Sequence, residues 1–218
     1  MTDTALQRKN MVESQVRPSD VTDRRITAAM QDLAREDFVP SALKPLAYMD
    51  EPIAVAPGRS LMAPRTFARL LQLADVDAGD KVLIVGALTG YSAAVVARCA
   101  AQVVALESDA ALAAAAKSAL SAKNVSLASG PLTDGWPAAA PFDVIIIEGG
   151  FELLPPQLLG QLSSSGRLVG IDVSGGVGRA VTIETLGAKD NVTTSRRVAF
   201  EAAAVCLPGF ARSSAFTF

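Results

Sequence analysis

The sequence contains no histidine among its 218 residues. This absence excludes Ser-His-Asp and Cys-His nucleophilic schemes, and it removes both the commonest transition-metal ligand and the usual general base. The two cysteines, Cys99 and Cys206, stand alone and lack the CxxC spacing of a metal or redox motif. Any chemistry must therefore use carboxylates, hydroxyls, backbone amides and a cofactor, and we expect no metal site.

Charge and long apolar runs are also scarce. Charged residues make up 19% of the chain and the net charge is -2, whereas nucleic-acid-binding surfaces usually carry a strongly basic patch. No segment approaches the roughly 18 apolar residues of a membrane span. The opening segment, residues 1–10, also lacks the apolar core of a signal peptide. We therefore expect a cytoplasmic protein with neither a nucleic-acid nor a membrane partner.

The most informative segment covers residues 81–109, where the pattern reads strand, glycine turn, helix, strand and acidic residue. Lys81–Val85 is a short β-branched run that Gly86 follows directly, Tyr91–Ala100 is helix-compatible, and Gln102–Leu106 is a second apolar run. Glu107 follows this second run. Ligands of parallel sheets bind at the carboxyl ends of the strands, where a carboxylate can hold the hydroxyls of a ribose. The segment therefore predicts a nucleotide-cofactor crevice.

The turn itself, residues 86–90, separates two classes of cofactor. A dinucleotide turn requires glycines at positions 86, 88 and 91, and only Gly86 complies. A methyltransferase turn of the GxGxG type is satisfied by Gly86 and Gly90 but not by Leu88. A plain strand-to-helix turn without a ligand remains a third interpretation.

Hydrophobic periodicity predicts alternating helices and strands over most of the chain. The predicted helices cover residues 10–17, 24–35, 64–74, 91–100, 110–122 and 156–162. The predicted strands cover residues 81–85, 102–106, 124–127, 142–147, 167–171, 180–186 and 198–207. Prolines make residues 43–58 a loop-rich segment, and the last two strands suit an antiparallel hairpin at the edge of the sheet.

Several segments together resemble the protein-L-isoaspartate O-methyltransferase family. They are MVESQVR at 11–17, AYMDEP at 47–52, GDKVLIVGALTGYSAAVVA at 79–97, GWPAAAPFDVIII at 135–147, GRLV at 166–169 and the terminal AVCLP. The resemblance covers about residues 10–208 and implies a class I methyltransferase-like Rossmann α/β fold. We expect a mixed seven-stranded sheet with a C-terminal antiparallel hairpin and helices on both faces. The expected single domain has a cap at 1–75, a cofactor-binding core at 76–175 and a hairpin and tail at 176–218.

The resemblance also implies an activity. Members of the family repair damaged proteins by transferring a methyl group from S-adenosylmethionine to an isoaspartyl carboxylate. Because this carboxylate is already ionised near pH 7, the reaction needs no general base, which suits a chain without histidine. The implied partners are isoaspartyl-containing proteins or peptides. The implied cofactor contacts are Gly86, Ala87, Thr89, Gly90 and Glu107.

The sequence departs from the family where function is decided. Met62 stands at the family's active-site serine, which leaves Ser60 as the nearest hydroxyl and the expected substrate contact. Leu88 replaces the middle glycine of the turn, and Pro131 replaces an aspartate that serves the adenine. Glu148 replaces a small or hydroxyl residue near the methyl-transfer point and, if ionised, would repel an isoaspartyl carboxylate.

These departures leave several hypotheses open. The chain is an active carboxyl methyltransferase, a catalytically degenerate binding or regulatory module, or a methyltransferase that Glu148 directs to a different acceptor. A nicotinamide oxidoreductase is the poorest fit to the turn. Arg59 is expected to be a solvated side chain, with pairing to a substrate carboxylate as the alternative.

Overall fold

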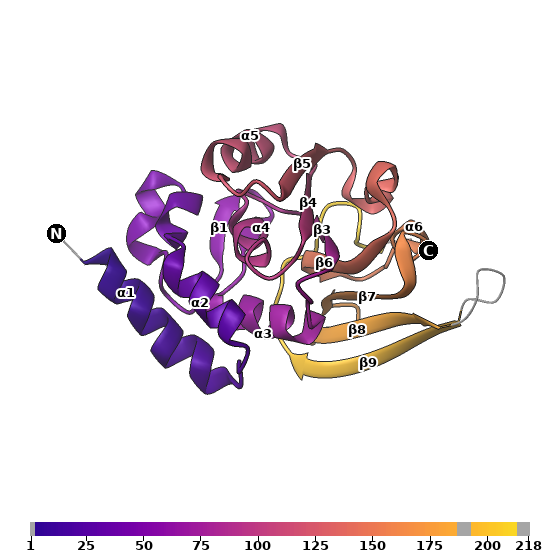
Figure 1. Ribbon diagram of the computed structural model, residues 1–218, viewed down its shortest axis with the longest axis horizontal. Coiled ribbons are helices and arrows are strands. Elements are labelled where there is room, and N and C mark those ends of the chain that lie inside the picture. Colours follow the sequence, from indigo (N-terminus) through magenta and orange to yellow (C-terminus); the bar gives the residue numbers. More distant parts are fainter. Residues whose placement is uncertain (1–2, 187–192, 213–218) are drawn as a thin grey trace, which may run out of the picture.

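A mixed seven-stranded sheet forms the centre of the computed structural model, which describes residues 3–186 and 193–212 (Figure 1). The strand order is β5-β4-β3-β6-β7-β8-β9. Neighbours from β5 to β7 are parallel, and β8 and β9 add an antiparallel hairpin at one edge. The strands are β3 (Lys81–Val85), β4 (Gln102–Glu107), β5 (Val125–Ser129), β6 (Phe142–Phe151), β7 (Leu162–Asp172), β8 (Arg179–Leu186) and β9 (Thr193–Glu201). The predicted sheet and its C-terminal hairpin are thus confirmed.

Helices cover both faces of the sheet, and the N-terminal ones gather at one end of the molecule (Figure 1). The α-helices are α1 (Thr4–Met11), α2 (Arg24–Asp32), α3 (Pro64–Ala74), α4 (Tyr91–Val96), α5 (Ala110–Ala119) and α6 (Pro156–Leu159). A π-helical turn covers Val12–Val16, and 3-10 turns cover Arg17–Ser19, Arg35–Phe38, Ser41–Leu46, Leu132–Asp134 and Pro137–Ala139. A separate two-stranded sheet pairs β1 (Ile53–Ala56) with β2 (Arg59–Leu61).

The central strands β3 and β6 are buried on both faces, which explains their unbroken apolar runs. Side chains alternate between the faces because successive Cβ atoms of a strand point in opposite directions. Val82 and Ile84 belong to one core cluster, and Leu83 and Val85 belong to the other. By the same alternation, the side chains of Ile146 and Glu148 in β6 point toward the same face of the sheet.

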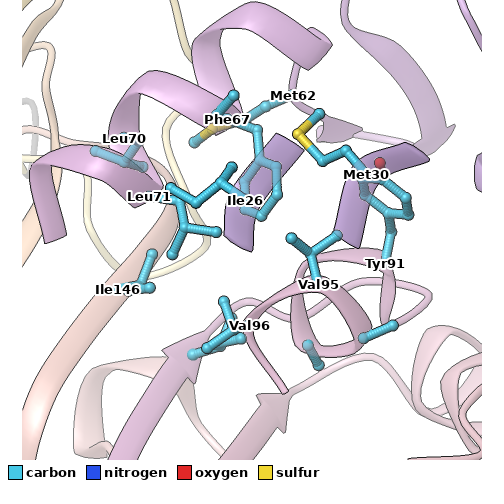
Figure 2. Close-up of a cluster of buried hydrophobic side chains, with 14 of the residues drawn as sticks. Ile26, Met30, Met62, Phe67, Leu70, Leu71, Tyr91, Val95, Val96 and Ile146 are labelled. Carbon is cyan, nitrogen blue, oxygen red and sulfur yellow. The ribbon is translucent and has the colours of Figure 1, made fainter. Parts of the chain in front are cut away.

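The larger core cluster joins the N-terminal helices to this first face. Ile26 and Met30 of α2 lie beside Phe67 of α3 and Tyr91 of α4, and Ile146 of β6 lies below them (Figure 2). The ring centroids of Phe67 and Tyr91 are 6.0 Å apart. The N-terminal segment expected to form a cap is therefore packed onto the sheet and α4 through a continuous apolar interface.

The structure corrects several predicted boundaries. The first helix begins at Thr4, six residues before the predicted start, because Asp3 caps it through the backbone N–H groups of Ala5 and Leu6. The segment predicted to be loop-rich contains the β1-β2 hairpin. The last strand is β9 and ends at Glu201, whereas the prediction placed it at residues 198–207. Its first half is polar because both faces of an edge strand can meet solvent, which conceals it from an apolar pattern. The tail beyond residue 212 lies outside the described residues.

Candidate functional site

The turn after β3 keeps the backbone of a glycine-rich loop although one glycine is missing. Gly86 and Gly90 have φ angles of 85° and 94°, and Leu88 between them also lies in the left-handed region with φ 52°. A side chain in that conformation costs roughly 1–2 kcal/mol. Leu88 is fully buried in the larger core cluster, so apolar packing offsets the strain. The turn thus retains its shape, and the side chain of Leu88 packs in the hydrophobic core.

Glu107 ends β4 beside this turn, and its side chain is fully buried. Its Oε2 accepts a hydrogen bond from the backbone N–H of Leu88 at 2.8 Å. Its Oε1 accepts from the backbone N–H groups of Ser108 at 2.8 Å and Asp109 at 2.9 Å. The carboxylate is therefore held rigidly at the carboxyl end of the strand, the place where the sequence predicts a ribose contact.

Arg59 of β2 binds this same carboxylate. Its Nη1 donates to Oε1 of Glu107 and its Nη2 to Oε2, both at 2.7 Å. The arginine side chain is only 4% exposed, so the expectation of a solvated Arg59 is wrong. Its partner belongs to the chain itself, and no substrate carboxylate is needed. A bidentate pair of this kind is geometrically specific and occupies both carboxylate oxygens.

Leu207 fills the space over the glycine turn. A methyl group added to Gly86 would lie 3.1 Å from Cδ1 of Leu207 and 3.3 Å from Nη2 of Arg59. A methyl group added to Gly149, just after Glu148, would lie 2.5 Å from Cδ2 of the same leucine. The side chains of Leu207 and Arg59 therefore occupy the surface that a glycine turn normally leaves free for a ligand.

Ala87 and Thr89, the other predicted cofactor contacts, are both buried. Ala87 is fully buried in the core. The hydroxyl of Thr89 donates to the backbone carbonyl of Phe38, which ties the turn to the cap. Pro131 lies exposed just beyond the end of β5. Gly86 and Gly90 lie in the turn after β3 and Glu107 ends β4 beside it; a cofactor contact by these three residues stays a prediction.

Ser60, Met62 and Glu148 do come together, in a cavity of about 210 Å³ beside the glycine turn. Met62 is nearly buried and belongs to the core cluster that also holds Phe67 (Figure 2). The full lining is Pro52, Gly58, Ser60, Met62, Glu148, Gly149, Ala203, Ala204, Val205 and Leu207. This cavity is mainly apolar, with a hydroxyl and a carboxyl group as its polar side chains.

Glu148 is an unusual residue to line such a cavity, because it carries an acidic side chain and is only 2% exposed. Its Oε2 accepts a hydrogen bond from the hydroxyl of Ser92, and its Oε1 has no hydrogen-bond partner. Burial raises the pKa of Glu148 from its ordinary value of 4.5 to about 8, although the Ser92 hydrogen bond and the nearby Arg35 and Arg59 oppose this rise. The protonated, neutral form of this group therefore predominates at pH 7.

The crevice in this form does not fit S-adenosylmethionine. A cofactor ribose needs the oxygens of Glu107, which already accept from Arg59 and from three backbone N–H groups. The body of a cofactor would also overlap Leu207 above Gly86. Among residues 3–186 and 193–212, no group of three or more cysteine, aspartate or glutamate side chains could hold a metal ion.

The strand order, the glycine turn and the acidic residue at the end of β4 define a Rossmann-like methyltransferase fold. The family model of protein-L-isoaspartate(D-aspartate) O-methyltransferase matches residues 6–201. The chain belongs to this family, whose members use S-adenosylmethionine. It is 39% identical over 171 residues to protein-L-isoaspartate O-methyltransferase 1 of Rhodopseudomonas palustris, covering 77% of this chain and 70% of the relative. It is 41% identical over 169 residues to the enzyme of Methylorubrum extorquens, covering 77% and 74%.

Solved structures agree on the fold. A protein-L-isoaspartate O-methyltransferase superposes with a TM-score of 0.77 at 22% identity, covering 93% of this chain and 66% of that one. A Plasmodium falciparum protein of the same methyltransferase designation, in complex with S-adenosyl-L-homocysteine, gives a TM-score of 0.75 at 20% identity and covers 92% and 97%.

Sequence reasoning missed the Arg59–Glu107 pair and the position of Leu207. The pair joins residues 48 positions apart, and no periodic pattern in the sequence links Arg59 to the end of a distant strand. One signal was available, since Arg59 is expected as an alternative to pair with a carboxylate, although the carboxylate named there is that of a substrate.

Proposed function

We propose that this family member binds a protein acceptor at the cavity and, in the form described, does so without taking up S-adenosylmethionine. The bidentate Arg59–Glu107 pair carries this proposal because it occupies the carboxylate that would hold the cofactor. The chain would then act as a recognition module that has kept the family's scaffold. Fold alone does not fix activity, since function depends on the chemistry of the site.

Opening the crevice has an energetic cost that supports this proposal. Separating a buried ion pair and leaving one charge unpartnered costs about 3–5 kcal/mol. If the open form is rarer by that amount, the apparent affinity for a ligand falls by at least about a hundredfold. Leu207 must move as well, because it packs on Gly86 and Gly149. We therefore expect negligible binding of the cofactor by the unaltered protein.

The acceptor we propose is a protein segment that carries an isoaspartyl residue. This choice rests on the names of the curated relatives, which are protein-L-isoaspartate O-methyltransferases, and on the position of the cavity beside the carboxyl ends of β3 and β6. A cytoplasmic location is part of the same proposal. In the described part of the chain, no helix is long and apolar enough to cross a membrane.

Carboxyl methylation by the family's reaction is the second candidate. Glu107 and its three backbone donors favour it, because this arrangement keeps a carboxylate at the ribose position. The cofactor would supply the methyl group, and the chain would have to release Glu107 from Arg59 first. This candidate predicts tight cofactor binding by the unaltered protein.

Calorimetric titration with S-adenosylmethionine and S-adenosylhomocysteine separates the two candidates. The proteins to compare are the unaltered chain, Arg59→Gln, and Arg59→Gln with Leu207→Ala. Arg24→Gln is the surface control. We expect no heat from the unaltered protein and the control at about millimolar ligand, and weak binding once Arg59 and Leu207 are removed. Micromolar binding by the unaltered protein would reject the first proposal in favour of methylation.

A further inference from the structure

Glu148, one of the residues that line the cavity, has a side-chain oxygen that the fold leaves unpaired. Oε1 of Glu148 is buried without a hydrogen-bond partner, while Oε2 accepts from the hydroxyl of Ser92 on α4. Since Ser92 donates to Oε2, the proton of the neutral carboxyl group belongs on Oε1. A buried donor without an acceptor costs free energy, and a ligand that brings an acceptor oxygen would recover it. Ser60 offers a second hydroxyl in the same cavity.

The groups around Glu148 favour a neutral carboxyl group on balance. Burial is the largest influence on its pKa, and the carboxylate of Glu107 adds to the effect. Arg35 from the cap and Arg59 from β2 act in the opposite direction, but the guanidinium of Arg59 is already paired with Glu107. Tyr91 on α4 is the remaining titratable neighbour, and burial raises its pKa. No cation in the described chain pairs directly with Glu148, so the cavity presents a donor and not a fixed negative charge.

We propose that Glu148 is the specificity-determining residue of this cavity and takes a carboxyl group of a peptide acceptor through a hydrogen bond from its own neutral carboxyl group. The inference rests on the proposed function, because it names the chemistry that the recognition site selects. Two carboxyl groups at hydrogen-bond distance share one proton readily, whereas two carboxylates repel each other. Glu148 therefore admits an acidic side chain when it is protonated and rejects it when it is ionised.

This assignment reverses what the sequence predicts for Glu148. The sequence treats the residue as an anion that would exclude an isoaspartyl carboxylate. Burial between α4 and β6 removes the charge, and the same side chain becomes the donor that the cavity otherwise lacks at Met62. The remaining lining, which includes Pro52, Val205 and Leu207, is apolar. Such surroundings strengthen a hydrogen bond because they exclude water.

Peptide binding at two pH values tests the proposal. The probes are a fluorescent peptide with one L-isoaspartyl residue and the same peptide with L-aspartyl or asparagine at that position. With the pKa of Glu148 at about 8, the fraction of the protein in which Glu148 is protonated, and therefore able to bind the peptide, falls about tenfold between pH 6 and about pH 9. We expect the same loss of affinity for the isoaspartyl peptide, and little change for the asparagine peptide. The aspartyl peptide shows whether the cavity distinguishes an isoaspartyl carboxyl group from an ordinary aspartyl side chain.

Variants at this position add a second readout. Glu148→Gln keeps a donor at every pH, so its affinity for the isoaspartyl peptide should be independent of pH. Glu148→Ala removes the donor and should weaken binding at both pH values by about tenfold or more. Glu13→Gln, on the exposed surface, should behave like the unaltered protein. Calorimetry near pH 8 should also detect uptake of about half a proton on binding.

The outcomes are distinguishable. Equal affinity of the unaltered protein for the isoaspartyl peptide at both pH values, matched by Glu148→Gln, would overturn the role of Glu148 and leave the recognition function standing. Failure of all the peptides to bind at either pH would overturn the recognition function and this inference together. If Glu148→Ala does not fold, the pH profile of the unaltered protein still decides.

Discussion

Arg59 and Glu107 are 48 residues apart in the sequence, yet the two guanidinium Nη atoms donate to the two carboxylate oxygens at 2.7 Å. This pair fastens the β1-β2 hairpin of the cap to the end of β4 in the sheet. This interaction adds a buried polar link to the apolar interface of the N-terminal helices, and together with Leu207 it closes the crevice.

Replacing Arg59 with methionine should lower the free energy of unfolding by about 3–5 kcal/mol, because Glu107 would remain buried without its partner. Urea denaturation measures the change. Arg59→Met with Glu107→Gln should recover part of the loss, since the unpaired charge is then removed. Arg65→Met is a matched control because Arg65 pairs with Asp50 at an exposed position, and it should change stability by less than about 1 kcal/mol. A loss at Arg59 no larger than that at Arg65 would contradict the buried pair.

At Leu88 the glycine variant should be more stable than the alanine variant, which is the reverse of the order expected for a leucine within a helix. Both substitutions remove a buried side chain, which costs about 2–5 kcal/mol. Glycine also relieves the left-handed backbone at φ 52°, so Leu88→Gly should be more stable than Leu88→Ala by about 1 kcal/mol. At Leu71 in α3, glycine should be less stable than alanine by about 1 kcal/mol. Chemical denaturation of the four variants tests this, and the same order at both positions would count against strain in the turn.

Glu148→Gln should change how stability depends on pH. In the unfolded chain the carboxyl group of Glu148 loses its proton near its ordinary pKa of 4.5, whereas in the folded protein it does so only at about 8. The folded state therefore holds an extra proton between these values, and the contribution of this group to stability falls as pH rises from about 5 to about 8. Glutamine has no such titration.

The difference in unfolding free energy between Glu148→Gln and the unaltered protein should therefore shift in favour of the variant across this range, by at most about 1.4 kcal/mol per pH unit. Urea denaturation at several pH values measures this shift, with Glu13→Gln as the exposed control. A difference that stays constant with pH would show that Glu148 does not carry the proton.

Arg35 should not tolerate lysine. It is fully buried, and its Nε donates to the carbonyl of Ala47 at 2.8 Å while its Nη2 donates to that of Met62 at 2.6 Å. A lysine ammonium cannot reproduce this forked geometry, and one carbonyl would be left unpaired. We expect Arg35→Lys to cost about 2–4 kcal/mol. Thermal unfolding compares it with Arg24→Lys on the exposed face of α2, which should lie within about 0.5 kcal/mol of the unaltered protein.

Much of the fold could be predicted because its signals are local. The buried strands β3 and β6 appear as apolar runs, and the proline at position 64 marks the start of α3. The predicted bounds of the first helix and of β9 are wrong, because the polar residues of both elements meet solvent and carry little periodic signal. The resemblance of separated segments gave the family, which the family model over residues 6–201 confirms.

For this protein the sequence by itself determined the family, the seven-stranded sheet, the glycine turn that follows β3 and the position of Glu107 at the end of the adjacent strand β4. Only the tertiary structure decided which side chains fill the crevice and whether the nearby Glu148 is charged. Arg59 reaches Glu107, and Leu207 reaches Gly86, through contacts between distant segments. The neutral state of Glu148 arises from burial. Contact and burial both depend on the packed chain in three dimensions, and for that reason no local pattern of residues encodes them.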